Sequence, residues 1–580
     1  MTNLRPVTLG CCPSKVSNSC ILSKLIEGLD NREDPILRPN QNGFRRDRST
    51  TQCILALQRL VDLAKYSGKK TALLFIDYSD AFNSVYWPKC REVLEQLGVP
   101  EKLIVAAMAL MHDVTTRVET PNGLTDPINV FAGVLQGDTL APFLFICVID
   151  IIMRRALVSF PGITFSRVDG STCSLTDLDY ADDLAIFFEE SPGVTVESEV
   201  ERFLATIVPI AAEYGLKLNF KPKKTEVLYI NNTTPLPVKT PDGAILHVTK
   251  DYKYLGSLII DREAEFLRRK SGAWAALKQF KPIWRSTLSI GHKKTVFDAL
   301  VVSIYMYGME TWSIGTKLLA KITGTYTQMV RFVKNVRVYS AATAMSNTVL
   351  FEGLDRIEDT LVQRRLRFAG HCQRSKQPVA DLLLAPLPTR THGTKPTLNM
   401  VSVLQADVKR ATKSEQLPTP LQLRHLMMDR DKWSAIVASA RTNMALYRTP
   451  DAVVARIQTR SSKPPHRDLK SWDELKSSGK ATRRKELRKA IAARRCAVAA
   501  CGQPNCQTHC QDCQETHPPS TDWLPQCQLC SMHSAVSCEP HPSDTHMIID
   551  SITPALAETI FLCYDCYVIC RHYPMPPEFR

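Results

Sequence analysis

Apolar side chains alternate between two spacings over the first 260 residues. Residues 52–66 place them three and four positions apart, which predicts a helix that ends at Gly68. Residues 71–76 (TALLFI) are a short and continuously apolar run, which predicts a buried strand. Helix and strand patterns that follow one another in this way are typical of an α/β domain.

A short polar sequence, YADD at 180–183, separates two further apolar runs. Residues 175–181 and 184–188 each have strand length, so we expect a hairpin whose tight turn holds Asp182 and Asp183. Adjacent carboxylates on a rigid turn suit hard cations such as Mg²⁺, which prefer oxygen ligands. Aspartate is also a common turn residue, so the turn alone leaves both interpretations open.

The pattern becomes mostly helical, and rich in Lys and Arg, after about residue 265. Residues 459–495 are charged and contain few large apolar side chains, which indicates a linker or an exposed helix. Their last part, 483–495, suits phosphate contact or nuclear import as well as a solvated helix face. We therefore divide the chain into four segments: 1–260, 261–450, a basic linker at 451–495 and a Cys/His-rich module at 496–572.

The composition is that of a globular, basic protein. Of the 580 residues 44% are hydrophobic, and 73 Lys and Arg against 58 Asp and Glu give a net charge of +15. Such a surplus favours a polyanionic partner, because each neutralised phosphate releases counterions. The longest apolar run, 140–149, is too short to span a bilayer, and the first residues lack a signal-peptide pattern. We expect an intracellular protein without a membrane partner.

A third carboxylate, Asp77, directly follows the predicted strand at 71–76. A carboxylate at a strand end can face a hairpin turn, although Asp77 can also cap a helix that begins near Ala81. Phe82 lies five residues further on, where its ring can pack under an incoming sugar or simply in the core.

Three loops between and around these carboxylates combine glycine or basic residues. The GVLQGD sequence at 133–138 lets the backbone approach a nucleotide closely, or is a glycine turn before a helix. Three arginines follow a turn in QNGFRRDR at 41–48, where guanidinium groups can bind phosphate. Lysines at 223–224 can neutralise or protonate a leaving pyrophosphate.

In this order and spacing, the segments resemble the reverse transcriptase of non-LTR (LINE-type) retrotransposons. The matching motifs are LRPVTL at 4–9, QNGFRRDRST at 41–50, FIDYSDAF at 75–82, GVLQGDTLAP at 133–142, YADD at 180–183, GLKLN at 215–219 with KKT at 223–225, and YLG at 254–256. YMYGMETW at 305–312 and RRLRFAGHCQR at 364–374 are similar to the region that follows this domain in such elements.

The resemblance implies an α+β palm with an antiparallel sheet in a right-hand polymerase fold with fingers, followed by a helical thumb. It implies an RNA-directed DNA polymerase that uses two Mg²⁺ ions, dNTPs, an RNA template, and a DNA primer and target. The implied site residues are Asp77, Asp182 and Asp183 for Mg²⁺; Phe82 as sugar gate; Gln136 and Gly137 for template or nucleotide; Arg45 and Arg48 for the triphosphate; Lys224 as acid; and Tyr254, Leu255 and Gly256 as primer grip.

Two features depart from the family pattern. Asn219 and Lys224 are further apart than in the family motif, which puts the role of Lys224 in doubt. The chain also starts at the first reverse transcriptase motif, so we expect it to lack the N-terminal endonuclease region and part of the fingers. An alternative is therefore a catalytically inactive, reverse transcriptase-derived protein that binds nucleic acid.

The tail holds eleven of the 19 cysteines. Cys510, Cys513, Cys527 and Cys530 form two pairs with the spacing of a structural zinc site. A second site can combine Cys563 and Cys566 with two of Cys538, His541, His546, Cys570 and His572. A disordered cysteine-rich tail, or a zinc-dependent interaction scaffold, remains a competing interpretation. We expect nuclear localisation, with cytoplasmic assembly of a ribonucleoprotein.

Overall fold

The computed structural model describes residues 11–109, 111, 114–134, 137–336, 347–388 and 398–446. Residues 1–335 and 351–447 form one compact unit. A second unit comprises residues 336–350 and 448–580, and the short helix α13 (Asn347–Leu350) belongs to it.

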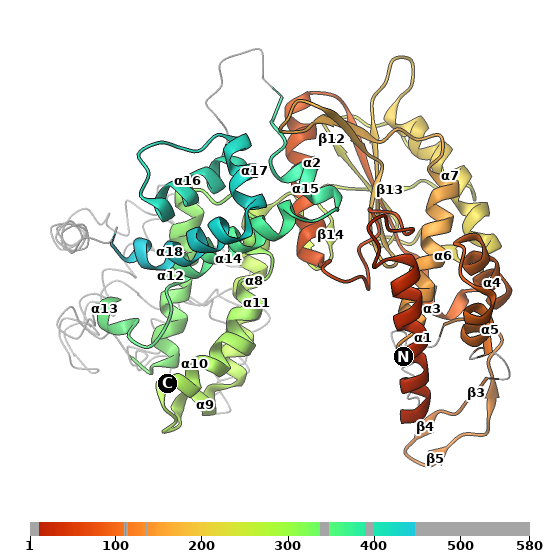
Figure 1. Ribbon diagram of the computed structural model, residues 1–580, viewed down its shortest axis with the longest axis horizontal. Coiled ribbons are helices and arrows are strands. Elements are labelled where there is room, and N and C mark those ends of the chain that lie inside the picture. The colour runs from red at the N-terminus through yellow and green to blue at the C-terminus, as the bar shows by residue number, and fades with distance from the viewer. Residues whose placement is uncertain are drawn as a thin grey trace, which may run out of the picture. The chain divides into compact units, whose positions relative to one another are not determined.

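A five-stranded sheet, in the order β13-β12-β1-β10-β9, lies at the centre of the unit (Figure 1). Its neighbours are antiparallel except for the parallel pair of β12 and β13. The predicted strand at 71–76 is the middle strand, and all six of its residues are buried. The strands are β1 (Thr71–Ile76), β9 (Asp177–Tyr180), β10 (Asp183–Glu189), β12 (Glu226–Ile230) and β13 (His247–Thr249).

Helices cover both faces of this sheet, and alternate side chains of β1 serve the two cores. Leu74 and Ile76 pack with α6 (Ala141–Ala156) and α7 (Val196–Glu213). Leu73 and Phe75 pack in the other core, with α2 and the C-terminal helices. This division follows from the strand geometry, in which successive side chains point to opposite faces.

The predicted helix at 52–66 is α2 (Thr50–Ser67), which begins with a capping box at Ser49. It ends at Gly68, whose φ of 76° is the left-handed conformation that terminates helices. The other described helices before residue 260 are α1 (Cys12–Leu29), α3 (Ala81–Ser84), α4 (Trp87–Gln96) and α5 (Glu101–Ala109). Short strands form further pairs: β2 (Tyr78–Ser79) with β11 (Lys217–Leu218), β3 (Thr115–Thr116) with β6 (Ile128–Asn129), β4 (Glu119–Thr120) with β5 (Gly123–Leu124), β7 (Ile163–Ser166) with β8 (Thr172–Leu175), and β14 (Lys253–Tyr254) with β15 (Ser257–Leu258).

The described part of the segment after residue 260 is helical, as predicted. Its elements are α8 (Arg262–Gln279), α9 (Lys281–Arg285), α10 (Ile290–Phe297), the π-helix η1 (Asp298–Val302), α11 (Ser303–Tyr305), the 3₁₀-helix η2 (Met309–Thr311), α12 (Thr316–Val333), α14 (Ile357–Gln373), α15 (Pro378–Leu383), α16 (Met400–Thr412), α17 (Pro420–Met428) and α18 (Arg430–Leu446). None of the helices in the described ranges is long and apolar enough to cross a membrane.

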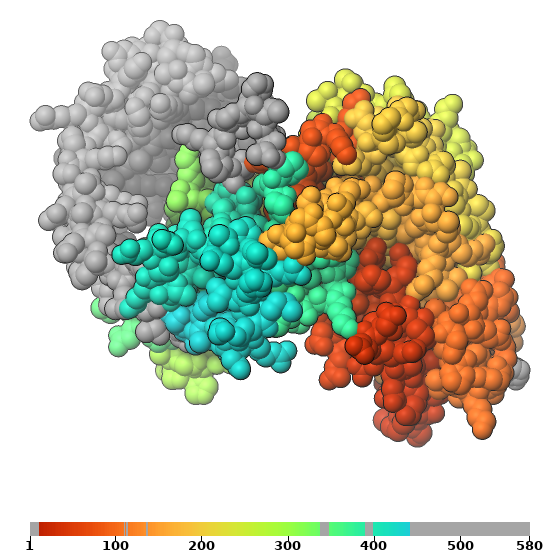
Figure 2. Space-filling model, turned by 45° about the horizontal axis from the view of Figure 1, so that its top comes forward, coloured from red at the N-terminus to blue at the C-terminus, as the bar shows by residue number. Residues whose placement is uncertain are grey.

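The C-terminal helices contact the sheet region through a buried arginine. Arg59 of α2 donates hydrogen bonds to the carbonyls of Leu382 (3.2 Å) and Ala385 (2.6 Å). Two ion pairs, Arg167–Asp381 and Arg424–Asp169, connect the β7–β8 hairpin to α15 and α17. Figure 2 shows the contact between these regions as an amber surface that lies against the teal surface of the C-terminal helices. The predicted boundary between residues 260 and 261 therefore lies within one compact unit.

The linker at 451–495 and the module at 496–572 lie outside the described residues. The zinc ligands Cys510, Cys513, Cys527 and Cys530, and the second pair Cys563 and Cys566, therefore stay predictions.

Candidate active site

The YADD sequence is the turn of a hairpin between β9 and β10. Asp183 pairs with Tyr180, which leaves Ala181 and Asp182 as the two loop residues. Ala181 has a φ of 57°, a left-handed conformation that two-residue hairpin turns require and that alanine rarely adopts. Asp183 is exposed and Asp182 half-buried, so the predicted hairpin is confirmed with both carboxylates near its tip.

Asp77 lies at the end of β1, beside this turn. In the antiparallel register of β1 and β10, Ile76 pairs with Leu184, and one further step brings Asp77 opposite Asp183. A second observation agrees with this placement. Burial raises the pKa of Tyr252, and the charges of Asp183 and Asp77 raise it further, so both carboxylates lie near this one phenol.

Polar groups from the segment after α7 converge on Asp77. Its carboxylate accepts a hydrogen bond from Asn219 (3.2 Å) and forms an ion pair with Lys224 Nζ (3.2 Å). Its backbone carbonyl accepts from Asn219 N (2.9 Å). Asn219 and Lys224 thus reach the same carboxylate despite their unusual spacing. The helix-cap interpretation of Asp77 is wrong, because α3 begins after Asp80.

The three aspartates suit a divalent cation by chemistry and by their position on neighbouring strand ends. Their side chains do not form a ready ligand set, however. Within the described ranges no three His, Cys, Asp or Glu side chains come together as a metal-binding group. Lys224 places an ammonium beside Asp77, so a positive charge already balances this carboxylate.

Phe82 packs against Phe145 of α6, with ring centroids 4.4 Å apart and nearly parallel planes. Its other neighbour is Phe44, which is 50% exposed and meets it edge-on at 6.4 Å. The carbonyl of Phe82 accepts a hydrogen bond from Val134 N (2.6 Å). The glycine loop therefore begins directly beside Phe82, whereas Gln136 lies outside the described residues.

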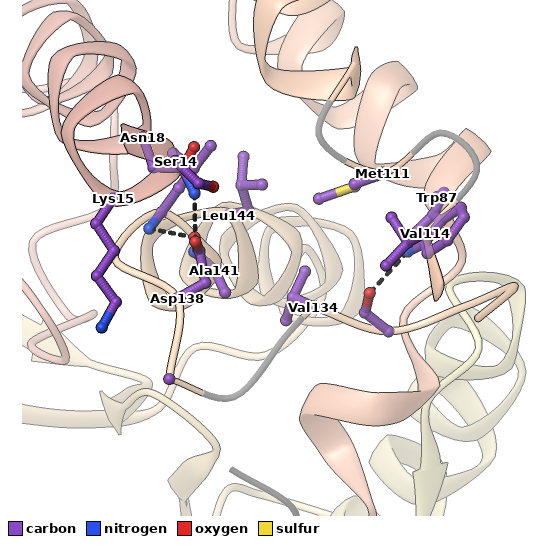
Figure 3. A pocket seen from close by; sticks show the side chains of 13 residues that line it. Ser14, Lys15, Asn18, Trp87, Met111, Val114, Val134, Asp138, Ala141 and Leu144 are labelled. Atoms are coloured by element: carbon purple, nitrogen blue, oxygen red, sulfur yellow. Dashed lines mark hydrogen bonds between the residues drawn. The ribbon is translucent and has the colours of Figure 1, made fainter. Parts of the chain in front are cut away.

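A cavity of about 100 Å³ lies next to this loop, between α1 and the start of α6 (Figure 3). Asp138 caps α6 by accepting hydrogen bonds from Leu140 N (2.7 Å) and Ala141 N (3.2 Å). Its second oxygen accepts a hydrogen bond from Asn18 of α1. Gly137, a predicted template or nucleotide contact, lies in the cavity wall.

Arg45 is buried, and its donors bind groups of the protein itself. They reach Asp30 and the carbonyls of Arg38 (2.6 Å) and Gln41 (2.9 Å). Arg48 donates to the carbonyls of Pro39 (2.6 Å) and Gln41 (2.8 Å). The predicted triphosphate contact has no support from Arg45, whose side chain has no exposed surface. Both arginines instead brace the loop at 38–41.

Comparison with known proteins agrees with this arrangement. Residues 1–259 match the family described as reverse transcriptase (RNA-dependent DNA polymerase).

The match to reverse transcriptases covers residues 1–259 of the 580.

The chain is 23% identical over 397 residues to a probable RNA-directed DNA polymerase from transposon BS of Drosophila melanogaster, covering 67% of this chain and 42% of that protein. It is 24% identical over 322 residues to the RNA-directed DNA polymerase from mobile element jockey of the same species, covering 54% and 33%. It is 25% identical over 329 residues to a Pol polyprotein from the type-1 retrotransposable element R2 of Popillia japonica, covering 55% and 43%.

These relatives confirm the resemblance to non-LTR retrotransposon reverse transcriptases. The matches span less than half the length of each relative. A solved telomerase structure from Candida tropicalis covers 63% of this chain and 55% of its own at 13% identity, with a TM-score of 0.29, which is too low to support an argument about the fold.

The predicted primer grip of the reverse transcriptase domain is a second tight turn, between β14 and β15. Tyr254 is buried and donates a hydrogen bond to the Leu178 carbonyl of β9 (3.1 Å). Leu255 has a φ of 46°, again left-handed. The Tyr307 hydroxyl donates to the Leu255 carbonyl (2.9 Å), and Arg269 donates to the Gly256 carbonyl (2.5 Å).

Sequence reasoning missed two groups that support the candidate site. Arg38 lies among three buried carboxylates, those of Asp150 (3.4 Å), Asp177 (2.9 Å) and Asp179 (2.5 Å). Burial and the like charge of Asp177 raise the pKa of Asp179. The second group is Gln41, whose amide reaches the YADD turn. The available signal for the first group was the pair of aspartates, Asp177 and Asp179, at alternate positions of the short strand β9.

Proposed function

We propose that this chain is an RNA-directed DNA polymerase that extends a DNA 3′-hydroxyl on an RNA template. The observation that carries the proposal is the register of β1 and β10, which brings Asp77 opposite Asp183 at the YADD turn. The reverse transcriptase domain and its polymerase relatives support the same activity.

Asp77, Asp182 and Asp183 would hold two Mg²⁺ ions. Such ions activate the attacking hydroxyl and stabilise the leaving oxygen in nucleotidyl transfer. Because Lys224 pairs with Asp77, this carboxylate would have to release the ammonium in order to bind a cation. The ammonium of Lys224 would then be available to neutralise the departing pyrophosphate.

The remaining groups would position substrates. The face of Phe82, fixed by its stacking on Phe145, would support the sugar of an incoming dNTP. The YLG turn would hold the primer end, and Gln136 with Gly137 would contact template or nucleotide. The Cys/His tail would bind zinc and nucleic acid, in a protein that works in the nucleus after cytoplasmic assembly with its RNA.

Primer extension on an RNA template with Mg²⁺ tests the proposal, with Asp182→Asn beside the parent chain. We expect the variant to lose at least about 100-fold in rate, since even outer partners of metal ligands are worth about 10- to 100-fold. Glu119→Gln, an exposed change in the β4–β5 hairpin, is the control and keeps the parent rate. Equal rates in Asp182→Asn and the parent, or a parent that binds RNA without extending a primer, would contradict the proposal. The second result would favour the catalytically inactive binding protein.

A further inference from the structure

We propose that Gln41 is a positioning residue that holds the YADD turn in the conformation its two carboxylates need. This inference rests on the proposed polymerase function. Gln41 lies 140 residues before the turn and comes from the loop that precedes α2. It has no exposed surface.

The amide of Gln41 binds both polar groups of one residue in the turn. Its Oε1 accepts a hydrogen bond from Ala181 N (2.9 Å), and its Nε2 donates to the Ala181 carbonyl (3.4 Å). The same Oε1 also accepts from Gly43 N (2.8 Å). A single buried side chain therefore satisfies backbone groups on both segments, away from water.

The turn requires such support at this residue. Ala181 precedes Asp182 and has a left-handed φ of 57°, which is unfavourable for a residue with a Cβ atom. A strained backbone conformation persists only where the surrounding contacts determine it. The carbonyl and N–H of Ala181 are the groups that a change of this φ would move, and Gln41 binds both.

Gln41 is itself held in place from several directions. Its backbone carbonyl accepts hydrogen bonds from Arg45 (2.9 Å) and Arg48 (2.8 Å). On either side of it, Asn42 N donates to the Asp179 carbonyl (2.8 Å), and Asp179 N donates to the Asn40 carbonyl (3.0 Å). The loop thus runs along the end of β9 like an additional strand. By binding the Gln41 carbonyl, Arg45 and Arg48 help to fix the residue whose side chain holds the turn.

Close approach of the loop depends on Gly43. A Cβ atom at this position would lie 2.4 Å from Ala181 N, well inside van der Waals contact. The QNG sequence therefore combines an amide that binds the turn with a residue small enough to let the loop reach it. Metal ligands must be held within a fraction of an ångström, so a loosened Ala181 peptide would weaken cation binding before it weakened primer binding.

Gln41→Met tests the inference, because methionine keeps the volume and removes the amide. The matched control is Gln58→Met in α2, since Gln58 is also buried but neither of its amide atoms has a hydrogen-bond partner among the described residues. Mn²⁺ binding is measured by calorimetry on the primer–template complex, and the Mg²⁺ concentration for half-maximal extension is measured alongside.

We expect Gln41→Met to weaken Mn²⁺ binding and raise the half-maximal Mg²⁺ concentration about 10-fold, as other supports of metal ligands do. Primer–template affinity and the values for Gln58→Met stay at the parent level. Gln41→Glu retains an acceptor for Ala181 N and gives an intermediate result, and it serves as the test if Gln41→Met does not fold.

Equal cation dependence in Gln41→Met, Gln58→Met and the parent would overturn the inference while leaving the polymerase proposal intact. A parent chain that extends no primer would overturn the polymerase proposal instead. In that case the Mn²⁺ titration still tests the role of Gln41. A Mn²⁺ site that Asp182→Asn abolishes but Gln41→Met leaves unchanged would contradict this role, and so would the absence of any Mn²⁺ site in the parent chain.

Discussion

Two tight turns of this domain, YADD at 180–183 and YLG at 254–256, both contain an unfavourable backbone conformation, but different residues stabilise it in each. Each contains a left-handed residue that is not glycine, Ala181 in one and Leu255 in the other. The first turn is held by Gln41, from within the reverse transcriptase domain. The second is held by Tyr307 and Arg269, which follow that domain in the chain. The turn that carries the proposed metal ligands is thus supported from within residues 1–259, whereas the turn proposed to hold the primer is supported by residues that follow them.

The largest expected effect concerns the buried charge beneath the YADD turn. Arg38→Met leaves the buried carboxylates of Asp177 and Asp179 without the arginine that pairs with them, so we expect the free energy of unfolding to fall by about 3–5 kcal/mol. Denaturant titration measures this change. The control is Arg154→Met, which removes a partly exposed partner of Asp150 and should lower stability by about 1 kcal/mol or less. Equal losses in the two variants would show that the buried network does not support the turn.

A smaller effect is expected where the loop meets the YADD turn. Gly43→Ala adds a Cβ atom against Ala181 N, so we expect a loss of about 1–3 kcal/mol in stability together with weaker cation binding, seen as a higher half-maximal Mg²⁺ concentration. Gly28→Ala in α1 is the matched control, because nothing lies within 4 Å of the added atom and alanine favours a helix by up to about 1 kcal/mol. Thermal unfolding and Mg²⁺ titration separate the two variants. A stable Gly43→Ala protein with parent cation dependence would contradict the close approach.

The smallest expected effect concerns the hydrogen bond that Tyr307 donates to the YLG turn. Tyr307→Phe removes the hydroxyl that binds the Leu255 carbonyl, and a hydrogen bond of this kind is worth about 1 kcal/mol, or roughly fivefold in affinity. We expect this loss in primer–template affinity, measured by fluorescence anisotropy, without a change in Mg²⁺ dependence. The control is Tyr305→Phe, which removes a buried hydroxyl bound to the Ile322 carbonyl and should affect stability alone. A shift in Mg²⁺ dependence with Tyr307→Phe would contradict the separate roles of the two turns, because it would show that the YLG turn also affects cation binding.

Local patterns in the sequence predicted much of the framework. The apolar run at 71–76, the hairpin around Asp182 and the helix ending at Gly68 all depend on spacing within a few residues, and the structure confirms them. The alternation of Leu73 and Leu74 between two cores is a further consequence of strand geometry.

Long-range contacts could not be read from the sequence in the same way. The pairing of Ile76 with Leu184 depends on a register that no local pattern specifies. Arg45 offers the same donors to a phosphate as to a carbonyl, and only the fold directs them inward. Gln41 carries no charge and lies far from the turn in sequence, so its contact with Ala181 became visible only in three dimensions.

Single-nucleotide incorporation by Asp77→Asn and Asp80→Asn on an RNA template tests the central claim most directly. The two aspartates lie three residues apart, but only Asp77 lies opposite Asp183, while Asp80 is exposed and its side chain caps no helix. We predict a loss of at least about 100-fold for Asp77→Asn, as expected when a direct metal ligand is removed. Asp80→Asn should stay within about twofold of the parent, since exposed substitutions change free energies by about 0.5 kcal/mol or less. Equal rates for the two variants would contradict a metal-binding role for Asp77.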